Sequence, residues 1–398
     1  MRNIVCDVPA LRFPEFIKSW ECSILEKLSK KIGDGIHSTP SYDDNGTFYF
    51  INGNNLNGGK IVITSSTKRV SEKEAYKNNA ENLEANSILM SINGTIGNVA
   101  LYHNEPIMLG KSACYINSKD NIDKNYLFYY LQYPKTQLYF EAELTGTTIK
   151  NLSLQSIRKT KIYIPTIEEQ HKISRFLQKI DERISTQNKI IEKLETLIKG
   201  IVDSIFTANE FPKVPFKEIY VRAGEGGTPA TSNPEYYDNG TIPFIKIDDL
   251  QNKYIKTNKD CITELGLQKS SAWIVPANSI IYSNGATIGA ISINLFPVCT
   301  KQGILGVVPK ADINVEFLYY FMTSTAFTKA VERIVTEGTM RTAYLKDINH
   351  IPCPVPCSVK QDEIAKLLST LSEKLENEVI FQMKLQKQKE FLLSQMFI

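Results

Sequence analysis

The sequence predicts an α+β protein in which two similar mixed α/β domains are each followed by a long helix, with the two helices pairing antiparallel. Two observations support this fold class. Apolar residues recur at alternating steps of four and three over Thr166–Phe206 and again over Ser358–Ile398, and strand-rich blocks before these helices match one another. A repeat near 190 residues is typical of duplicated domains rather than of a solenoid. We therefore expect a pseudo-two-fold internal repeat.

The first long helix is predicted over Thr166–Phe206, and its narrow apolar seam is interrupted at Gln187. A stripe this narrow is best buried against another long helix, as in a coiled coil. At about 1.5 Å per residue, roughly forty residues would make a rod of about 60 Å, which is a spacer length. The seam consists of Ile173, Leu177, Ile180, Ile184, Ile191, Leu194, Ile198, Ile201 and Ile205.

The second long helix, predicted over Ser358–Ile398, supplies the partner for this seam. A shift of 191 residues aligns the two helices. Its seam is weaker because polar residues occupy Glu378, Gln382 and Lys389. The apolar positions that match are Ile364, Leu368, Leu371, Leu375, Leu385, Leu392 and Met396.

Both long helices are expected to begin with a capping box that follows a proline. In a capping box, a hydroxyl accepts from the amide three residues later, and the side chain of that later residue reaches back. The pairs are Thr166 with Glu169 after Pro165, and Ser358 with Gln361 after Pro356.

The domains before the helices match at several anchors, so the chain divides into a domain 1–165, a helix 166–208, a domain 209–357 and a helix 358–398. The aromatic runs among these anchors are interpreted as core rather than as base-stacking surfaces. The matched pairs are Ile88–Gly97 with Ile280–Gly289, Tyr126–Tyr130 with Phe317–Phe321, Gly146-Thr147 with Gly338-Thr339, Gln170 with Gln361, Thr39-Pro40 with Thr228-Pro229, and Gly46–Ile51 with Gly240–Ile245.

The composition is that of an ordinary globular protein. The 398 residues are 42% hydrophobic and 22% charged, which is ample for two folded domains. A net charge of +3 neither requires nor excludes DNA, because any nucleic-acid surface would need local clustering of charge. Seven scattered cysteines favour reduced thiols in the cytosol. No apolar run approaches the ~20 residues of a membrane span, so we expect a cytoplasmic protein without a membrane role.

The sequence shows no catalytic or cofactor-binding pattern. Gly224–Pro229 lacks the spacing of a phosphate-binding loop, and the prolines at its end oppose a helix start. Asn233–Tyr236 resembles the (N/D)PP(Y/F) signature of amino-group DNA methyltransferases, but Glu235 replaces the second proline. Cys353 and Cys357 lack the further ligands of a zinc site. We expect no catalytic residue, no cofactor and no metal.

The order of the motifs resembles the specificity subunit of type I restriction-modification enzymes. Asp34–Tyr42 is similar to that family's DGxHxTPxY opening of a target recognition domain, and Gly226–Ile245 to its GGTP…YxxGxIPFI variant. Ile162–Gln170 resembles the approach to the first conserved helix, where an IPxxxEQ pattern is typical. The second copy departs from this pattern where Lys360 replaces Glu169.

This resemblance implies a non-catalytic subunit with two target recognition domains. Each domain would read one half of a split, asymmetric target in double-stranded DNA, and the two helices would separate the domains and dock two methyltransferase subunits. S-adenosylmethionine would be bound by those partners, and ATP by a further restriction and translocation subunit.

The DNA contacts are expected on loops, with basic side chains at phosphates and polar ones at base edges. The placement of cations is repeated, because Lys111 corresponds to Lys301 at a shift of 190 and Lys150 to Arg341 at 191. The candidates are His37, Ser38, Tyr42, Asn52, Asn54, Lys111 and Lys150 in the first domain, and Thr228, Lys246, Asn284, Lys301, Gln302 and Arg341 in the second.

Three other functions stay open on the sequence. The chain could be a specificity subunit of another modification system, or a DNA methyltransferase acting alone. It could also be a coiled-coil interaction protein without a DNA role, in which Gln187, Glu378 and Gln382 would specify the oligomer.

Overall fold

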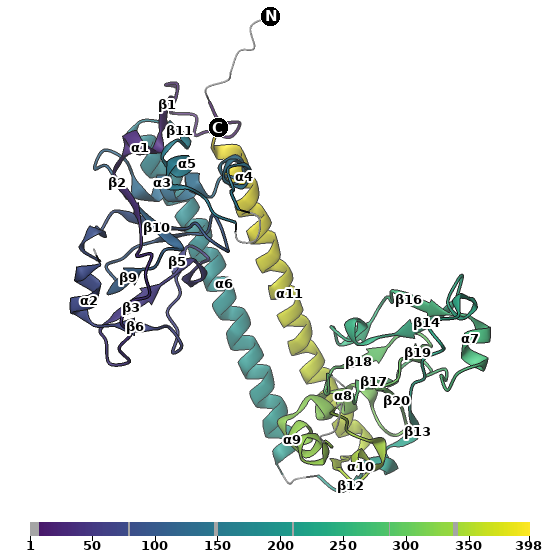
Figure 1. The fold of residues 1–398 in the computed structure, drawn as a ribbon. Coiled ribbons are helices and arrows are strands. Elements are labelled where there is room, and N and C mark those ends of the chain that lie inside the picture. The colour runs from purple at the N-terminus through teal and green to yellow at the C-terminus, as the bar shows by residue number, and fades with distance from the viewer. Residues whose placement is uncertain (1–7, 79, 147–149, 209–210, 286, 337–340) are drawn as a thin grey trace, which may run out of the picture. The chain divides into compact units, whose positions relative to one another are not determined.

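The computed structural model describes residues 8–78, 80–146, 150–208, 211–285, 287–336 and 341–398. They form two compact units, and Figure 1 follows them along the chain. The first unit comprises Met1–Gln187 and Phe381–Ile398, and the second comprises Asn188–Ile380. Each long helix therefore contributes residues to both units. Within the described residues, no helix combines the length and hydrophobicity needed to cross a membrane.

The first unit is built on a four-stranded antiparallel sheet with the order β2-β10-β7-β8. All residues of β7 and β10 are buried, because this sheet has helices or a second sheet packed on it. The second sheet has the order β6-β3-β9, with one antiparallel and one parallel pairing. The strands are β2 (Ser29–Asp34), β3 (Phe48–Ile51), β6 (Arg69–Val70), β7 (Ser87–Ser91), β8 (Val99–Leu101), β9 (Ile107–Leu109) and β10 (Ala113–Ser118), and a small pair joins β4 (Leu56–Asn57) to β5 (Lys60–Ile61).

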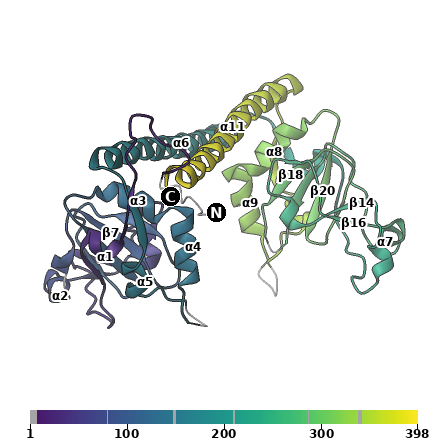
Figure 2. The ribbon, with the colours of Figure 1, turned by 90° about the horizontal axis from the view of Figure 1, so that it is seen from above.

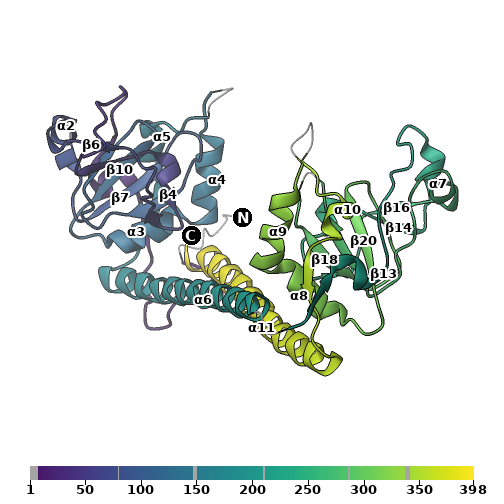
Figure 3. The same ribbon diagram turned by 90° about the horizontal axis from the view of Figure 1, so that it is seen from below.

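Helix α3 (Lys124–Leu131) lies between the central sheet of the first unit and the beginning of the first long helix (Figure 3). Tyr126, Tyr129 and Tyr130 of this helix are among the largest fully buried side chains, which confirms their interpretation as core. The strand β1 (Glu21–Ile24) pairs with β11 (Lys161–Ile164), which leads into the long helix. The other helices are α1 (Leu25–Leu28), α2 (Glu72–Lys77), α4 (Pro134–Ala142) and α5 (Leu154–Arg158).

The second unit repeats this arrangement. Its central sheet has the order β13-β20-β17-β18-β15, and its smaller sheet, β16-β14-β19, again has one antiparallel and one parallel pairing. In Figure 2, α8 lies beside the second long helix, with β14, β16 and α7 on the far side of the unit. The strands are β12 (Lys213–Pro215), β13 (Tyr220–Glu225), β14 (Ile242–Ile245), β15 (Tyr254–Ile255), β16 (Asp260–Ile262), β17 (Ile280–Ser283), β18 (Ile291–Asn294), β19 (Cys299–Thr300), β20 (Ile304–Pro309) and β21 (Pro352–Pro354). The helices are α7 (Glu264–Gln268), α8 (Val315–Thr323), α9 (Thr325–Ile334) and α10 (Leu345–Ile348).

The internal repeat predicted from the sequence is confirmed by this topology. The sheet β2-β10-β7-β8 corresponds to β13-β20-β17-β18, and β1-β11 corresponds to β12-β21. Helices α3, α4 and α5 correspond in order to α8, α9 and α10. Of the anchors, Thr147, Gly338 and Thr339 lie outside the described residues. The pseudo-two-fold relation stays a prediction.

The long helices are α6 (Ile167–Thr207, 41 residues) and α11 (Ser358–Met396, 39 residues), within two residues of their predicted ends. In the first unit, the beginning of α6 shares a core with the end of α11, where Leu177 packs in one cluster with Leu392. In the second unit, the end of α6 shares a core with the beginning of α11, where Phe206 packs in one cluster with Leu368. The helices thus pair antiparallel within each unit.

The capping boxes are only half present at α6 and absent at α11. Thr166 Oγ1 accepts from the Glu169 amide at 3.5 Å, but the Glu169 carboxylate does not return to the cap. It lies instead 2.7 Å from Arg12 Nε and 3.3 Å from Trp20 Nε1. Ser358 is the first residue of α11 rather than its cap, and the Gln361 amide donates to the carbonyl of Cys357 at 3.1 Å. The prediction was wrong because buried tertiary partners take these side chains.

Candidate nucleic-acid interface

In the first unit, loops that carry predicted site residues meet at one end of the central sheet. The Gly35 amide, just after β2, donates to the carbonyl of Ala113 at 3.1 Å. The next amide, that of Ile36, donates to the carbonyl of Leu109 at 2.9 Å. The Gly110 amide in turn donates to the carbonyl of Ile51 at 2.8 Å. Backbone bonds therefore join the loop after β2, the end of β3 and the turn between β9 and β10.

A glycine is required where the first of these loops leaves the sheet. A Cβ atom on Gly35 would lie 2.1 Å from the carbonyl oxygen of Leu109. The corresponding residue of the second unit is Gly226, on which a Cβ atom would lie 2.0 Å from the carbonyl oxygen of Thr300. Both distances are far shorter than a carbon–oxygen contact allows. The glycine of the motif that opens each unit is thus explained by the close approach of two backbone segments.

Asn52 positions its loop, whereas Asn54 and Lys111 face solvent. The Asn52 side chain is half-buried, and its Oδ1 accepts from Ser112 Oγ at 2.9 Å. Ser112 Oγ also accepts from the Gly53 amide at 2.9 Å, so the loop after β3 is fastened to the β9–β10 turn. Asn54 and Lys111 are exposed beside these bonds.

Lys150 borders the same cluster of loops. The Asn93 side chain donates to the carbonyl of Lys111 at 3.1 Å, and the Asn93 backbone is bridged to Asn151. The next amide, that of Leu152, donates to the carbonyl of Ile92 at 2.9 Å. The structure therefore brings the segment that carries Lys150 next to the turn that carries Lys111, and both side chains are exposed.

The remaining candidates of the first unit lie on the loop after β2. His37 Nε2 is 2.8 Å from Asp34 Oδ2, and the neighbouring Ser38 is exposed. Tyr42 is 47% exposed, and its ring packs edge-on against Phe50 with 5.8 Å between centroids. The Tyr42 ring therefore packs on Phe50 while about half of the residue stays exposed beside the loop.

Sequence reasoning missed two exposed cations beside Tyr42. The Lys68 ammonium lies 6.0 Å from the centroid of the Tyr42 ring, and the Arg69 guanidinium lies 4.9 Å from that of Tyr49. Both residues have exposed side chains, and the Asp43 amide donates to the carbonyl of Arg69 at 3.0 Å. The adjacent lysine and arginine could have signalled them, but no repeated anchor covers this segment.

The second unit forms the corresponding loop cluster. The Lys301 amide donates to the carbonyl of Ile245 at 3.0 Å, which places the turn before β20 beside Lys246. The Gln302 amide donates to Thr228 Oγ1 at 3.3 Å. Thr228, Lys246, Lys301 and Gln302 thus lie together, and the sequence predicted all of them.

Asn284 is buried, with 1% of its surface exposed, so its placement does not support a direct contact with DNA. Its Nδ2 donates to the carbonyl of Ala343 at 3.2 Å, and the Ala343 amide donates to the carbonyl of Asn284 at 2.9 Å. These bonds hold the segment that follows the exposed Arg341 against the end of the sheet. Asn284 therefore positions the backbone beside the candidate site rather than lying on its surface.

The cations of the two clusters differ in pairing. Lys246 is half-buried and forms an ion pair with Asp260 at 2.9 Å. The repeated cations are exposed, and within the described part of the chain they take part in no ion pair. They are Lys111, Lys150, Lys301 and Arg341. Uncompensated positive charge at corresponding places in both units is suited to binding a polyanion.

Comparison with known proteins identifies the family. A model of the family described as "Type I restriction modification DNA specificity domain" matches residues 18–196 and again residues 213–384. The chain belongs to this family. The family match occurs twice, in agreement with the duplicated topology.

Several relatives in this family carry specificity-subunit names. The chain is 29% identical over 191 residues to the type I restriction enzyme MjaIX specificity subunit of Methanocaldococcus jannaschii, which covers 46% of this chain and 44% of that protein. It is 31% identical over 159 residues to the HindI specificity subunit of Haemophilus influenzae, covering 38% of this chain and 34% of that protein. A putative MjaX specificity subunit of M. jannaschii is 25% identical over 304 residues, or 71% of this chain and 69% of that protein. The chain thus spans less than half the length of the first of these relatives.

Solved structures share the fold. The type I restriction-modification S subunit from M. genitalium superposes with a TM-score of 0.57 at 19% identity, covering 98% of this chain and 99% of that one. A chain from a study of complex assembly and conformational transition of the type I R-M system superposes with a TM-score of 0.60 at 15% identity, covering 95% and 97%. The predicted fold class is therefore confirmed.

Proposed function

We propose that this chain is the DNA sequence-specificity subunit of a type I restriction-modification complex. Each unit would read one half of a bipartite, asymmetric target in double-stranded DNA. The observation that carries this proposal is the repeated loop cluster, in which exposed cations occupy corresponding positions while the polar residues between them differ. Equivalent cations suit the phosphates, which are alike at every step, and different polar residues suit different bases.

The contacts would divide by chemistry. We assign Lys111, Lys150, Lys301 and Arg341 to phosphates, because they are exposed and unpaired within the described residues. Base edges would be read by the exposed polar side chains between them, which are His37, Ser38, Asn54 and Gln302, with Tyr42 stacking or packing beside them. The half-buried Asn52, Thr228 and Lys246 are placed to hold these loops, and each also has an edge toward solvent.

We infer that the chain contributes sequence recognition and no chemistry of its own. The family description names a specificity domain, and the relatives named above are specificity subunits. On this proposal, two methyltransferase subunits bind S-adenosylmethionine, and a restriction and translocation subunit uses ATP. The chain itself holds no cofactor and works in the cytoplasm, where DNA is accessible.

The long helices would set the length of the unread gap between the half-sites. Each helix is uninterrupted over 41 or 39 residues and contributes residues to both units. Paired as an antiparallel coiled coil, they would resist stretching, because each apolar residue would sit between residues of the other helix. The same helices would dock the methyltransferase subunits.

The test uses the full chain together with its methyltransferase partner subunit. This complex is incubated with S-adenosylmethionine and a library of random duplex DNA, and the methylated adenines are located by sequencing. We expect one asymmetric motif made of two short specified parts and a gap of fixed length. Methylation without sequence preference, or a single continuous motif, would contradict the proposal.

The chain without its partners is the matched control. We expect it to transfer no methyl group by itself, and methylation by the isolated chain would support the methyltransferase alternative instead. A complex whose DNA binding is independent of sequence would support the alternative of a coiled-coil interaction protein.

A further inference from the structure

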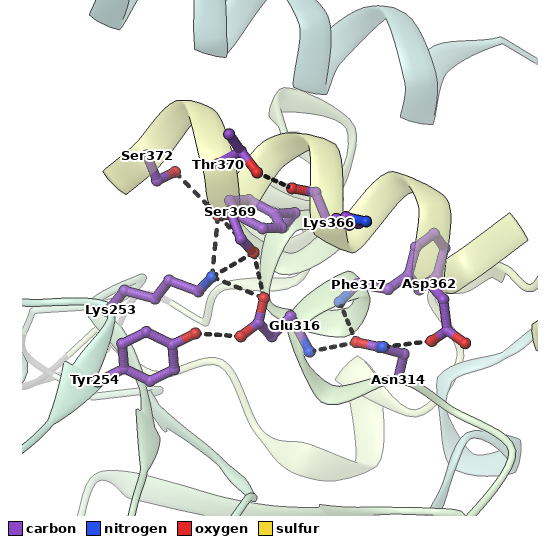
Figure 4. A network of polar contacts seen from close by, with 11 residues as sticks. Lys253, Tyr254, Asn314, Glu316, Phe317, Asp362, Lys366, Ser369, Thr370 and Ser372 are labelled. Atoms are coloured by element: carbon purple, nitrogen blue, oxygen red, sulfur yellow. Dashed lines mark hydrogen bonds and ion pairs between the residues drawn. The ribbon is translucent and has the colours of Figure 1, made fainter. Parts of the chain in front are cut away.

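A half-buried lysine in the second unit, Lys253, lies outside the candidate interface and bridges three elements (Figure 4). It lies just before β15, and its side chain is 14% exposed. Its Nζ is 2.8 Å from Ser369 Oγ on α11, 3.1 Å from Glu316 Oε2 on α8 and 3.1 Å from the hydroxyl of Tyr320 on α8. One ammonium group thus joins the segment after β14 to a short helix and to a long helix.

The groups around Lys253 complete its hydrogen bonding. Tyr254 and Ser369 both donate hydroxyl hydrogen bonds to the Glu316 carboxylate. The hydroxyl of Tyr320 lies 2.9 Å from Ser372 Oγ, one turn further along α11. The ammonium also lies 4.7 Å from the centroid of the Tyr320 ring, within the range of a cation–π contact. A satisfied network of this kind fixes the relative position of its elements.

Both charges of this pair persist near neutral pH. Burial alone would lower the pKa of Lys253, but hydrogen bonds, first that with Tyr320, outweigh burial and raise it. Burial alone would raise the pKa of Glu316, but hydrogen bonds, first that from Ser369, outweigh burial and lower it. The bridge is therefore a permanent tie rather than a pH switch.

Lys253 ends a short segment whose other end carries a candidate DNA-binding residue, Lys246. The Lys246 amide donates to Asp249 Oδ2 at 2.9 Å, and the Leu250 amide donates to the carbonyl of Ile247 at 3.0 Å. The carbonyl of Lys253 accepts from the Ile293 amide of β18 at 2.7 Å. The segment from Lys246 to Lys253 is therefore a compact turn, with its end tied to the central sheet by its backbone and to α11 by its lysine.

Next to the bridge, this segment and α11 are separated by a cavity. The cavity has a volume of about 1090 Å³, and Asp248, Lys256, Lys259, Ser372 and Glu376 are among the residues that line it. Because this space lies between the two elements, their side chains pack sparsely against each other there. The Lys253 bridge therefore ties the segment to α11 beside the cavity, while Leu250 ties it to the core through Ile245 and Ile255.

In the first unit, the cation beside the corresponding tyrosine comes from a different element. Tyr129 corresponds to Tyr320, and its hydroxyl donates to Asp181 of α6 at 2.8 Å. The cation there is Lys389 of α11, which is 2.7 Å from Asp181. The first unit thus takes its cation from a long helix, whereas the second takes it from the segment that carries Lys246.

We propose that Lys253 is a positioning residue for DNA reading by the second unit, holding the Lys246 segment in register with α11 through Ser369 and Glu316. This inference rests on the proposed function. It assigns to Lys253 no contact with DNA. Its loss should loosen recognition of one half-site and leave the other intact.

The first experiment maps methylation motifs with the complete complex. In K253M, a side chain of similar length lacks the charge and the hydrogen bonds. We expect discrimination at one half-site to fall about tenfold at its best-specified position, as for the loss of a charged hydrogen bond, with the other half-site unchanged. K253R keeps the charge and should restore part of the discrimination. K256M, at an exposed lysine just after β15, should behave like the parent complex.

The second experiment measures the segment's position without DNA. Spin labels are placed at D248C in the segment and at E376C on α11, both of which line the cavity, in the full chain with Cys6, Cys22, Cys261 and Cys357 changed to serine. We expect one narrow distance distribution in the parent and a broadened one in K253M.

The outcomes separate the two proposals. If the parent complex shows no bipartite motif, the proposed function fails, and the reading role of Lys253 fails with it, whatever the label distances show. If the parent shows the motif but K253M keeps both half-site preferences and the narrow distribution, Lys253 has no positioning role. Loss of both half-sites in K253M together with a lowered melting temperature would mean general unfolding and would also overturn the inference.

Discussion

The starts of the two long helices differ at one residue of a shared pattern, Glu169 in α6 and Lys360 in α11. Glu169 is 1% exposed and receives hydrogen bonds from Arg12 and Trp20, which precede the first strand. Lys360 is exposed and pairs with Glu363 at 3.0 Å within its own helix. The next residue, by contrast, is glutamine in both. A repeated residue is thus kept where its partners are repeated, and it diverges where they are not.

The glutamines that the two helix starts share have the same partners in both units. Gln170 Oε1 accepts from the Asp123 amide at 3.0 Å, and its Nε2 donates to the carbonyl of Pro165 at 3.0 Å. Gln361 makes the same two bonds, accepting from the Asn314 amide at 2.9 Å and donating to the carbonyl of Pro356 at 2.9 Å. Each glutamine therefore joins the start of a long helix to the cap of the short helix packed on it.

The largest difference between the units should appear on removing Glu169. E169A removes the acceptor of the buried Trp20 indole and the charged partner of the half-buried Arg12, and we expect the free energy of unfolding to fall by about 3 kcal/mol. The matched change K360A removes an exposed pair and should alter it by less than about 0.5 kcal/mol. Urea denaturation of the full-length variants measures both. Equal effects at the two positions would refute this account of the divergence.

The glutamines should respond alike. Q170A and Q361A each remove the partners of a part-buried amide and of a buried carbonyl, and we expect a loss of about 2 kcal/mol in each case. Circular dichroism during denaturation measures the stability of the whole chain. A fluorescent probe placed in each unit would show which unit loses stability. A loss confined to one variant would show that the two sites are not equivalent.

The repeated cations should contribute equally to DNA binding by the assembled complex. We expect K301A and R341A, like K111A and K150A, each to lower the slope of log K against log salt by about 0.9, the value for one phosphate contact. Titration of a fluorescent target duplex at several salt concentrations measures this slope. K217A, at an exposed lysine outside both loop clusters, serves as the control. An unchanged slope for a variant would remove that residue from the phosphate contacts.

The smallest expected effect is on the pH dependence of stability, and it concerns the second unit alone. The folded pKa of Glu316 lies below its ordinary value of 4.5, so its stabilising effect is present above that value and is lost as pH falls through the folded pKa. The folded pKa of Lys253 lies above 10.5, so its stabilising effect is present below that value and is lost as pH rises through the folded pKa. The stability difference between parent and E316Q should therefore shrink in acid. A difference that stays constant down to pH 3 would contradict this reasoning.

The local parts of the fold could be predicted from the sequence, and the long-range polar contacts could not. The seam of α6 repeats within one turn or two, so its spacing alone indicated a paired helix. The partner of Glu169 lies 157 residues away, at Arg12, and no spacing rule connects them. For the same reason Asn284 was predicted as a surface residue although it is buried, and Lys253 was not singled out at all.

The candidate site was predictable to the extent that it is repeated. Lys111 and Lys301 could be named as candidates because each unit carries a cation at the same place before β10 or β20. Lys68 and Arg69 were missed because the segments between the anchors differ between the units. If the two units recognise different bases, the side chains that contact those bases are expected in these differing segments.

The central claim is that each unit reads DNA by itself and that the helices alone set the spacing. The most direct test inserts one heptad, about two helical turns that preserve the seam, after Gln187 in α6 and after Ile380 in α11. Methylated adenines are then mapped on random DNA with the partner subunits present. We predict the same two half-sites separated by a gap about three base pairs longer. An unaltered gap, or half-sites with changed sequences, would contradict the claim.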